Sequence, residues 1–400
     1  MMHHRHGRPQ PSARKAMLAA SVLLGSLGTA MAGAADQPPA ELKMILSPGQ
    51  GRSDVITFST DGEDQPATKE SRPVETAEPT PMTVLPPEAT AESAAEREAL
   101  VSGKSRPRTK RESNRPSVSL GVGYRWDDLD WNIAGFGGSP NIRSELTFDE
   151  MESLVLSGNF RWRSESNLYF RGGVDIGTRL DGEVQDSDYD GNNRMFEFSR
   201  SYSEADGGSV LDASMGVGYL FEVPLQQQDM VFRVAPLLGY SYHRQDIEIT
   251  DGWQVAYEPY YGVVFDPLLG LDSRYDAKWT GPWIGLDFEL ELNQRHSIQA
   301  SLEYHWADYD ADANWNLRSD LAHPVSFEHD SDGDGFVASL TYTNNFAPQW
   351  FWTLGANYSK FKADPGKNLM YFSNGYWLST RLNEAEWESY AVTVGLGFKF

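Results

Sequence analysis

The chain has 400 residues, a net charge of −23 and no cysteine. The lack of cysteine excludes a disulfide framework and thiol chemistry, and the negative charge argues against nucleic acid as a partner because phosphate binding needs clustered cations. Aromatic residues make up 12% of the chain although its mean hydropathy is only −0.50, a combination typical of a protein with polar loops and local aromatic belts.

Residues 1–32 have the order of an export signal. Basic residues up to Lys15 precede an apolar stretch over 17–27, and Ala30-Met31-Ala32 places small residues at the two positions that a signal peptidase reads. The apolar stretch is too short to span a bilayer as a helix. We therefore predict export with cleavage after Ala32, with the bond after Ala34 as the second choice.

Residues 33–116 differ in composition from the rest of the chain. Proline and glutamate recur, and Phe58 is the only aromatic residue. Such a stretch cannot bury enough apolar surface to offset chain entropy, so we predict a disordered periplasmic segment. Its basic end, over 104–115, is interpreted as a solvated tail, with a clamp on anionic lipid head groups or cell-wall polymer as the alternative.

From Ser117 to Phe400 the sequence alternates repeatedly between apolar and polar residues. A strand points successive side chains to opposite faces, so each alternating segment predicts a strand with one apolar and one polar face. The last such segment places Val392, Val394 and Leu396 on one face and Thr393, Gly395 and Gly397 on the other. The ten predicted strands are 117–126, 152–163, 167–178, 209–222, 229–243, 279–292, 295–308, 334–345, 349–362 and 387–400.

The gaps between these strands alternate between short and long. Short turns at one end and long loops at the other are typical of an outer-membrane barrel, in which the closed sheet leaves no edge open to lipid. We predict an all-β, transmembrane antiparallel barrel of about ten strands over 117–400, in contact with outer-membrane lipid. The long gaps would face outside, and the barrel assembly machinery would recognise the C-terminal strand ending in Phe400.

The polar faces of the strands predict the content of the lumen. Arg161, Arg171, Arg233 and Glu303 fall on the inner parity. A barrel of about ten strands is narrow, so charges of mixed sign would pair and fill it, which argues against a diffusion porin. Pro236 lies in the middle of a predicted strand and lacks a backbone donor, so we expect a local distortion there.

Two acidic clusters lie in the long gaps. Asp186 and Asp188 are two residues apart in the third gap, and Asp308, Asp310 and Asp312 repeat this spacing in the seventh. Carboxylates at this spacing on an extended chain point the same way, and two of them held close can share a proton and hold a water. We expect the two clusters to face each other across the barrel mouth, although acidic loop tips are also common on an acidic protein.

Most of residues 117–400 resembles the omptins, a family of ten-stranded outer-membrane endopeptidases. The resemblance includes Glu-Leu-Thr-Phe at 145–148, the run 184–190, and Gly-Pro-Trp-Ile-Gly-Leu at 281–286. It implies proteolysis of polypeptides at the cell surface with no required cofactor.

The omptin resemblance also implies site residues. Asp186 and Asp188 match the family's carboxylate pair, and the aspartate of its Asp-x-His pair falls on Asp312, or on Asp310 with a two-residue shift. The histidine position then falls on Asn314, and an asparagine cannot act as a base. His305, His323 and His329 are the nearby histidines that could substitute.

Omptins also bind lipopolysaccharide on the outer wall. Their strand-five pattern Gly-Tyr-x-x-x-Arg matches residues 239–244, which implies that Tyr240, Tyr242 and Arg244 contact this lipid together with Lys278. Cations near the outer rim can pair with lipid phosphates. Ordinary rim residues are the equally simple alternative.

A metal site competes for the same aspartates. Asp186, Asp188, Asp190 and Glu197 fit the calcium-loop pattern D-x-D-x-D-G-x5-E, although no flanking helices are predicted. Two functions therefore remain open: an omptin-like endopeptidase, and a non-enzymatic surface binder, adhesin or structural protein with calcium-ordered loops.

Overall fold

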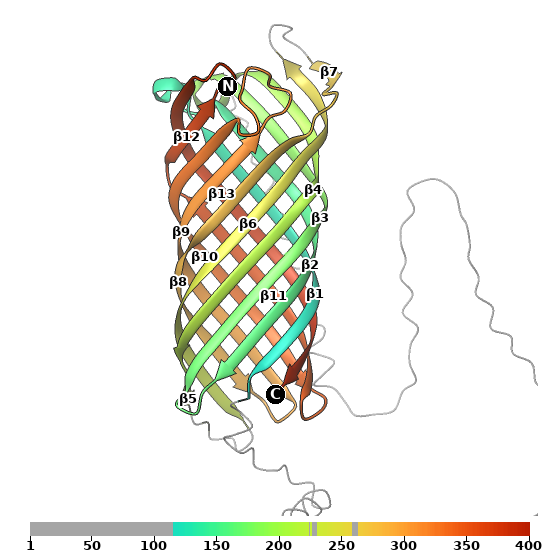
Figure 1. Ribbon diagram of the computed structural model, residues 1–400, viewed down its shortest axis with the longest axis vertical. Coiled ribbons are helices and arrows are strands. Elements are labelled where there is room, and N and C mark those ends of the chain that lie inside the picture. Colours follow the sequence, from blue (N-terminus) through green and yellow to red (C-terminus); the bar gives the residue numbers. More distant parts are fainter. Residues whose placement is uncertain (1–114, 224, 226–229, 258–262) are drawn as a thin grey trace, which may run out of the picture. The chain divides into compact units, whose positions relative to one another are not determined.

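The protein folds into a closed antiparallel β-barrel (Figure 1). The computed structural model describes residues 115–223, 225, 230–257 and 263–400, so the predicted export signal and nearly all of the predicted disordered segment lie outside the described residues. β1 pairs with both β2 and β13, which closes the sheet into a ring. The ten long strands are β1 (Ser117–Ile133), β2 (Ser144–Arg163), β3 (Leu168–Gly191), β4 (Met195–Tyr219), β6 (Val231–Tyr257), β8 (Ser273–Glu291), β9 (His296–Asn314), β10 (Phe327–Asn345), β11 (Trp350–Ala363) and β13 (Trp377–Lys399).

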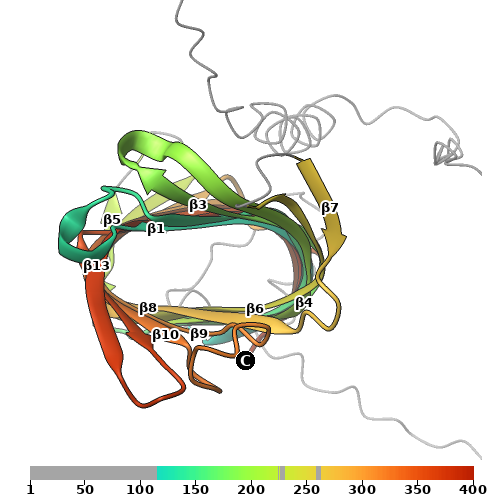
Figure 2. The same cartoon turned by 90° about the horizontal axis from the view of Figure 1, so that it is seen from above.

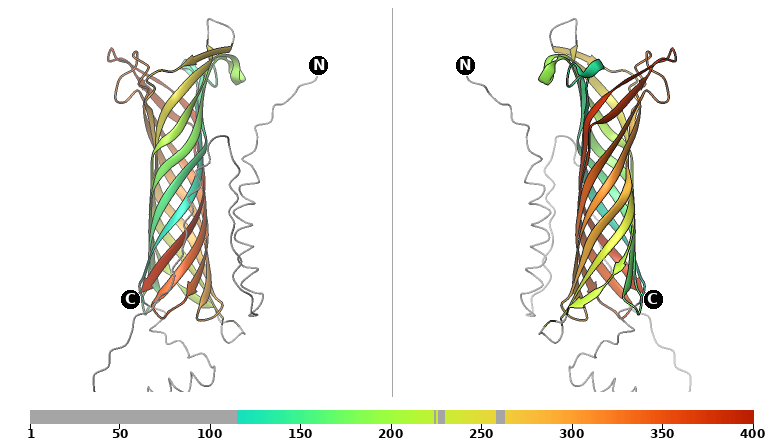
Figure 3. Two further views of the ribbon diagram at one scale, coloured as in Figure 1. Left: turned by 90° about the vertical axis from the view of Figure 1, so that its right-hand side faces the viewer. Right: turned by 90° about the vertical axis from the view of Figure 1, so that its left-hand side faces the viewer.

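Short elements complete the barrel at its two ends. They are β5 (Phe221–Val223), β7 (Val263–Pro267), β12 (Gly366–Tyr371) and the 3₁₀ turns η2 (Phe136–Gly138) and η3 (Asn192–Arg194). Seen along its axis, the barrel is an oval with β1 and β3 along one long side and β6 and β8 along the other (Figure 2). Two further views show the inclined strands on the remaining sides (Figure 3). We call the end that holds Ser117 and Phe400 the periplasmic end and the opposite end the outer end.

The ten predicted strands are confirmed, but most of them extend further at the outer end. β3 continues to Gly191 and β6 to Tyr257, and β10 begins at Phe327 rather than 334. Much of the sequence predicted as long loops is therefore paired sheet that stands beyond the lipid-facing zone. The pairing satisfies backbone groups that would otherwise depend on water.

The lipid-facing wall is an apolar band between two aromatic belts, as expected for an outer-membrane barrel. Its middle carries exposed aliphatic side chains such as Leu120, Leu156 and Leu286. The belt nearer the outer end contains Tyr124, Trp126, Tyr240, Tyr304, Trp306, Phe336, Tyr358 and Tyr390. The belt nearer the periplasmic end contains Trp162, Phe170, Tyr219, Phe288, Tyr342, Trp350, Trp352 and Phe398. None of the helices in the described part of the chain is both long and apolar enough to span a membrane.

The lumen changes character along the barrel axis. In the periplasmic half, charges of opposite sign pair as predicted: Arg171 contacts Asp287 at 3.0 Å and Glu303 at 2.7 Å. In the outer half, the interior is a dry apolar core. Its largest fully buried members include Trp279, Trp387, Tyr275, Tyr309, Phe148 and Phe361. This core closes the lumen, which agrees with the sequence argument against a diffusion porin.

The expected distortion at Pro236 is present. The β4–β6 ladder stops at the Gly218–Leu237 pair and resumes only at the Phe221–Val234 pair of β5 and β6. On its other side, Leu220 donates its backbone N–H to the carbonyl of Asn167, which continues the register of β3 and β4. The missing donor of proline therefore separates β5 from β4.

Candidate functional site

A groove of about 820 Å³ opens at the outer end of the barrel, above the dry core. Trp131, Leu146 and Phe327 of the core supply its apolar floor. Asp186 and Asp188 line the same groove. Further polar side chains on its walls are Ser144, Ser199, Ser201, Ser203, Gln254, Ser273, Asn368 and Thr380.

The outer extension of the sheet positions the carboxylate pair. Asp186 pairs with Leu146 of β2, and Asp188 pairs with Ser144, so both side chains point inward from β3 beside the buried Leu146. Trp315 and Arg318 approach from the connection between β9 and β10. The pair is therefore covered by residues far away in the sequence.

The two carboxyl groups have unusual proton affinities. Burial raises the pKa of Asp186 well above its ordinary value and the neighbouring Asp188 raises it further, whereas a hydrogen bond from Trp315 and the charge of Arg318 oppose the rise. Burial also raises the pKa of Asp188, against a hydrogen bond from Ser144 and the charge of Arg143. Two adjacent carboxylates that cannot easily both ionise take up the first proton as a unit, so the pair tends to share one proton.

Hydrolysis by the omptin pattern would also need a histidine base within reach of a water held by this pair. No histidine among the described residues lines the groove. The inward positions of β9 facing the groove floor are Ala311 and Ala313, which are buried and carry no titratable group.

The candidate histidines lie elsewhere. His329 is buried in the core with its Nδ1 atom 3.0 Å from the Tyr275 hydroxyl, and burial lowers its pKa to about 3. His323 is bonded to Asn314 at 2.7 Å in an exposed contact. His305 is buried deeper in the lumen, between Ser241 and Glu303. None of them completes the site expected from the omptin pattern.

The raised pKa of Asp186 has a measurable consequence for stability. A group whose pKa is raised on folding favours the folded state below its unfolded value, here 3.8, and this contribution is lost as the pH rises through the folded-state pKa. Asp186→Asn removes the titration. We expect this variant to be more stable than the unchanged protein at neutral pH and similar to it near pH 4. Urea unfolding midpoints between about pH 4 and pH 8 measure the difference, and a gap that does not change with pH would contradict this assignment.

Comparisons with known proteins place the barrel in a family. The family model described as "Protochlamydia outer membrane protein", or Pom, matches residues 119–400. The chain belongs to the Pom family. A search of curated proteins found no match for this Pom barrel.

Several solved outer-membrane barrels resemble the Pom barrel. The outer membrane protease OmpT of Escherichia coli matches with a TM-score of 0.58 and 12% identity, over 72% of this chain and 97% of that chain. A FadL homologue of Pseudomonas aeruginosa matches with a TM-score of 0.25 and 12% identity, over 72% and 90% of the two chains. At this identity the likeness to OmpT shows a shared barrel fold. The comparisons thus support the Pom family and an OmpT-like barrel fold, and they do not confirm membership of the omptin family itself.

The expectation that the two acidic clusters face each other across the mouth is wrong. On β9 the buried residues are Tyr309, Ala311 and Ala313, so Asp310 and Asp312 point to the outside of the wall. Asp312 is 3.1 Å from Lys278 on that outer surface. Neither aspartate can contact a ligand shared with Asp186.

The calcium pattern is not gathered into one site in this structure. Asp190 is bonded to Arg143, and Glu197 forms an ion pair with Arg200 at 2.6 Å. Within the described ranges, no group of three or more metal-ligating side chains has the geometry to hold an ion. Asp190 and Glu197 are therefore not placed as ligands together with Asp186 and Asp188 in this structure. Calcium binding by the outer loops stays a prediction.

The residues implied for lipopolysaccharide lie together on the outer wall. Tyr240 and Tyr242 belong to the outer aromatic zone of β6, and Arg244 is paired across the strands with Lys278 of β8. Arg244 donates two hydrogen bonds to the Asp276 carboxylate, both at 2.8 Å. Lys278 contacts the same carboxylate at 3.3 Å. The two cations are thus already partly neutralised by this chain, and lipid binding by these four residues stays a prediction.

Trp315 and Arg318 were missed by the sequence analysis. They lie in the connection after β9, where neither alternation nor a motif marks them. Their role at the site comes from interactions with Asp186 on β3, which is far away in the sequence.

Proposed function

We propose that this Pom barrel is a non-enzymatic binding protein of the cell surface, which holds an extended polypeptide in its mouth groove without cleaving it. The absence of the histidine that the omptin pattern requires beside Asp186 and Asp188, among the described residues, carries this proposal. The omptin-like fold supports a shared ancestry with a protease, of which this chain would retain the carboxylate half.

The chemistry of the groove suits such a ligand. Its apolar floor can take side chains of an extended segment, and its serine, glutamine and asparagine walls can bond backbone groups. A pair that shares one proton still carries one negative charge, so an N–H donor or a cationic group would bind there.

The proposal can be tested by comparing an aspartate in the groove, Asp188, with one on the outer wall, Asp310. The full-length protein, refolded in detergent, is mixed with a degenerate fluorogenic peptide library to follow cleavage by fluorescence and binding by anisotropy. We expect binding without cleavage. Asp188→Asn should weaken binding about tenfold, equivalent to about 1.4 kcal/mol, whereas Asp310→Asn on the outer wall should leave it unchanged.

Two results would contradict the proposal. Cleavage that Asp186→Ala abolishes would instead support the endopeptidase, with Asp186 and Asp188 holding the attacking water. Equal losses of binding in Asp188→Asn and Asp310→Asn would indicate a general effect of the negative charge and no groove site.

A further inference from the structure

The periplasmic half of the lumen contains a second hollow, separate from the mouth groove. Two neighbouring cavities of about 210 and 180 Å³ share Asn159, Arg161, Tyr169 and Gln299 among their lining residues. The second cavity also reaches Ser117 and Lys399 at the periplasmic end of the barrel. Because the dry core closes the lumen above them, the two cavities form one blind basin, which we call the lumen basin.

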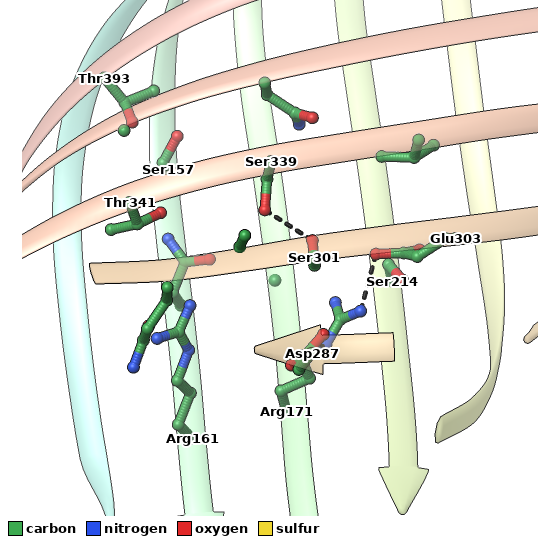
Figure 4. A pocket seen from close by; sticks show the side chains of 18 of the residues that line it. Ser157, Arg161, Arg171, Ser214, Asp287, Ser301, Glu303, Ser339, Thr341 and Thr393 are labelled. Atoms are coloured by element: carbon green, nitrogen blue, oxygen red, sulfur yellow. Dashed lines mark hydrogen bonds and ion pairs between the residues drawn. The ribbon is translucent and has the colours of Figure 1, made fainter. Parts of the chain in front are cut away.

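The arginine side chains of the lumen basin differ in whether a carboxylate contacts them. Arg171 is held by Asp287 and Glu303, and Arg233 contacts Glu291 at 2.9 Å. Arg161 lines both cavities but forms no ion pair with a carboxylate in the part of the chain that the structure describes. Figure 4 shows the contrast: a dashed contact joins Arg171 to Glu303, and none is drawn to Arg161. One guanidinium therefore faces the basin with no carboxylate in direct contact, although it lies near enough to Asp287 for the two charges to interact.

The wall around Arg161 is rich in hydroxyl and amide groups. Thr341 and Thr393 lie on the same side of the basin (Figure 4). Further in, the buried Ser214 hydroxyl and the Gln299 side-chain oxygen have no hydrogen-bond partner in the described protein. Buried polar groups are usually satisfied, so such a set indicates either ordered water or a hydroxylated ligand.

We propose that the lumen basin binds a small acidic saccharide from the periplasmic side. The Arg161 guanidinium would pair with the carboxylate or phosphate of the ligand, since its planar fork matches both groups. The serine, threonine and glutamine side chains would bond the sugar hydroxyls. The site is distinct from the mouth groove and does not depend on the function proposed for it.

Titration calorimetry on the full-length protein in a zwitterionic detergent tests the proposal. The probes are glucuronate, glucose 6-phosphate, glucose and inorganic phosphate. We expect one-site binding of at least one sugar acid, and at least tenfold weaker binding of glucose and of inorganic phosphate. Comparison of glucuronate with glucose 6-phosphate tells which acidic group the basin prefers.

Substitutions locate the binding. Arg161→Gln should weaken binding of the sugar acid at least tenfold. Arg295→Gln is the matched control, because Arg295 lies in the exposed turn between β8 and β9 at the same end of the barrel and lines neither cavity. Thr341→Val removes one lining hydroxyl without a change in charge and should weaken binding severalfold, which keeps the test decisive if Arg161→Gln fails to fold.

The proposal is overturned if no probe gives saturable binding, if inorganic phosphate binds as tightly as the sugar acids, or if Arg295→Gln weakens binding as much as Arg161→Gln. An unchanged affinity in both Arg161→Gln and Thr341→Val would likewise exclude the lumen basin as the site.

Discussion

Replacing Arg125 with methionine is expected to destabilise the barrel by about 3–5 kcal/mol, because it leaves buried carboxylates without their counter-charge. Arg125 is 3% exposed and donates from Nε to Asp127 at 2.9 Å, and it also contacts Asp212. Asp127 accepts a further bond from the Trp387 indole at 2.9 Å, so this ion cluster is joined to the bottom of the dry core. Urea unfolding in lipid vesicles, followed by tryptophan fluorescence, measures the loss.

Two comparisons separate the buried charge from a general effect of losing an arginine. Arg381→Met removes an exposed guanidinium that donates a hydrogen bond to Asn383, and should change stability by less than about 0.5 kcal/mol. Replacing Arg125, Asp127 and Asp212 together with apolar residues should recover much of the loss, because no unpaired charge then remains. A loss below about 1 kcal/mol for Arg125→Met would mean that water screens the cluster.

The membrane-spanning part of the fold was predictable because one physical rule governs it. Lipid demands apolar residues outside, and the narrow lumen accepts polar ones, so Leu302, Tyr304 and Trp306 alternate with Glu303 and His305 along β9. The paired charges inside followed from the same parity.

Beyond the outer aromatic belt, the rule reverses. Water now surrounds the wall and the apolar core lies inside, so Tyr309 and Ala311 point inward while Asp308 and Asp310 point outward. The pattern of apolar residues outside and polar residues inside ends at this reversal, which is why the predicted strands ended too early. For this reason the sequence analysis placed Asp310 and Asp312 in a loop at the barrel mouth, whereas they lie on the outward face of β9.

Bulges add a second obstacle to sequence reading. The register between β1 and β2 shifts between Asp127 and Leu129, and a matching irregularity lies between Asp149 and Glu152. Each extra residue moves all following side chains to the other face. The inward direction of Asp186 beside Leu146 therefore depends on pairings that the sequence does not reveal, and the cover from Trp315 depends on closure of the whole ring.

The dry core should be as important for stability as the ion cluster beneath it. Trp279 is fully buried, and its ring centroid lies 4.4 Å from that of Tyr309 and 5.6 Å from that of Phe361. Trp279→Ala is expected to cost about 3–5 kcal/mol, because the surrounding strands cannot move together to fill the space. Trp279→Phe should cost clearly less, since the indole N–H it removes has no hydrogen-bond partner in the described protein.

Trp377→Ala is the matched control, because Trp377 is 64% exposed at the start of β13 and its loss should have little effect on unfolding in urea. An equally small effect for Trp279→Ala would show that the outer half of the lumen is loosely packed and wet. A large effect would establish that the sheet beyond the membrane is held by its own apolar interior in addition to its hydrogen bonds. That interior supplies the floor of the mouth groove, so the same side chains that stabilise the outer extension also hold Asp186 and Asp188 in a fixed, partly desolvated position.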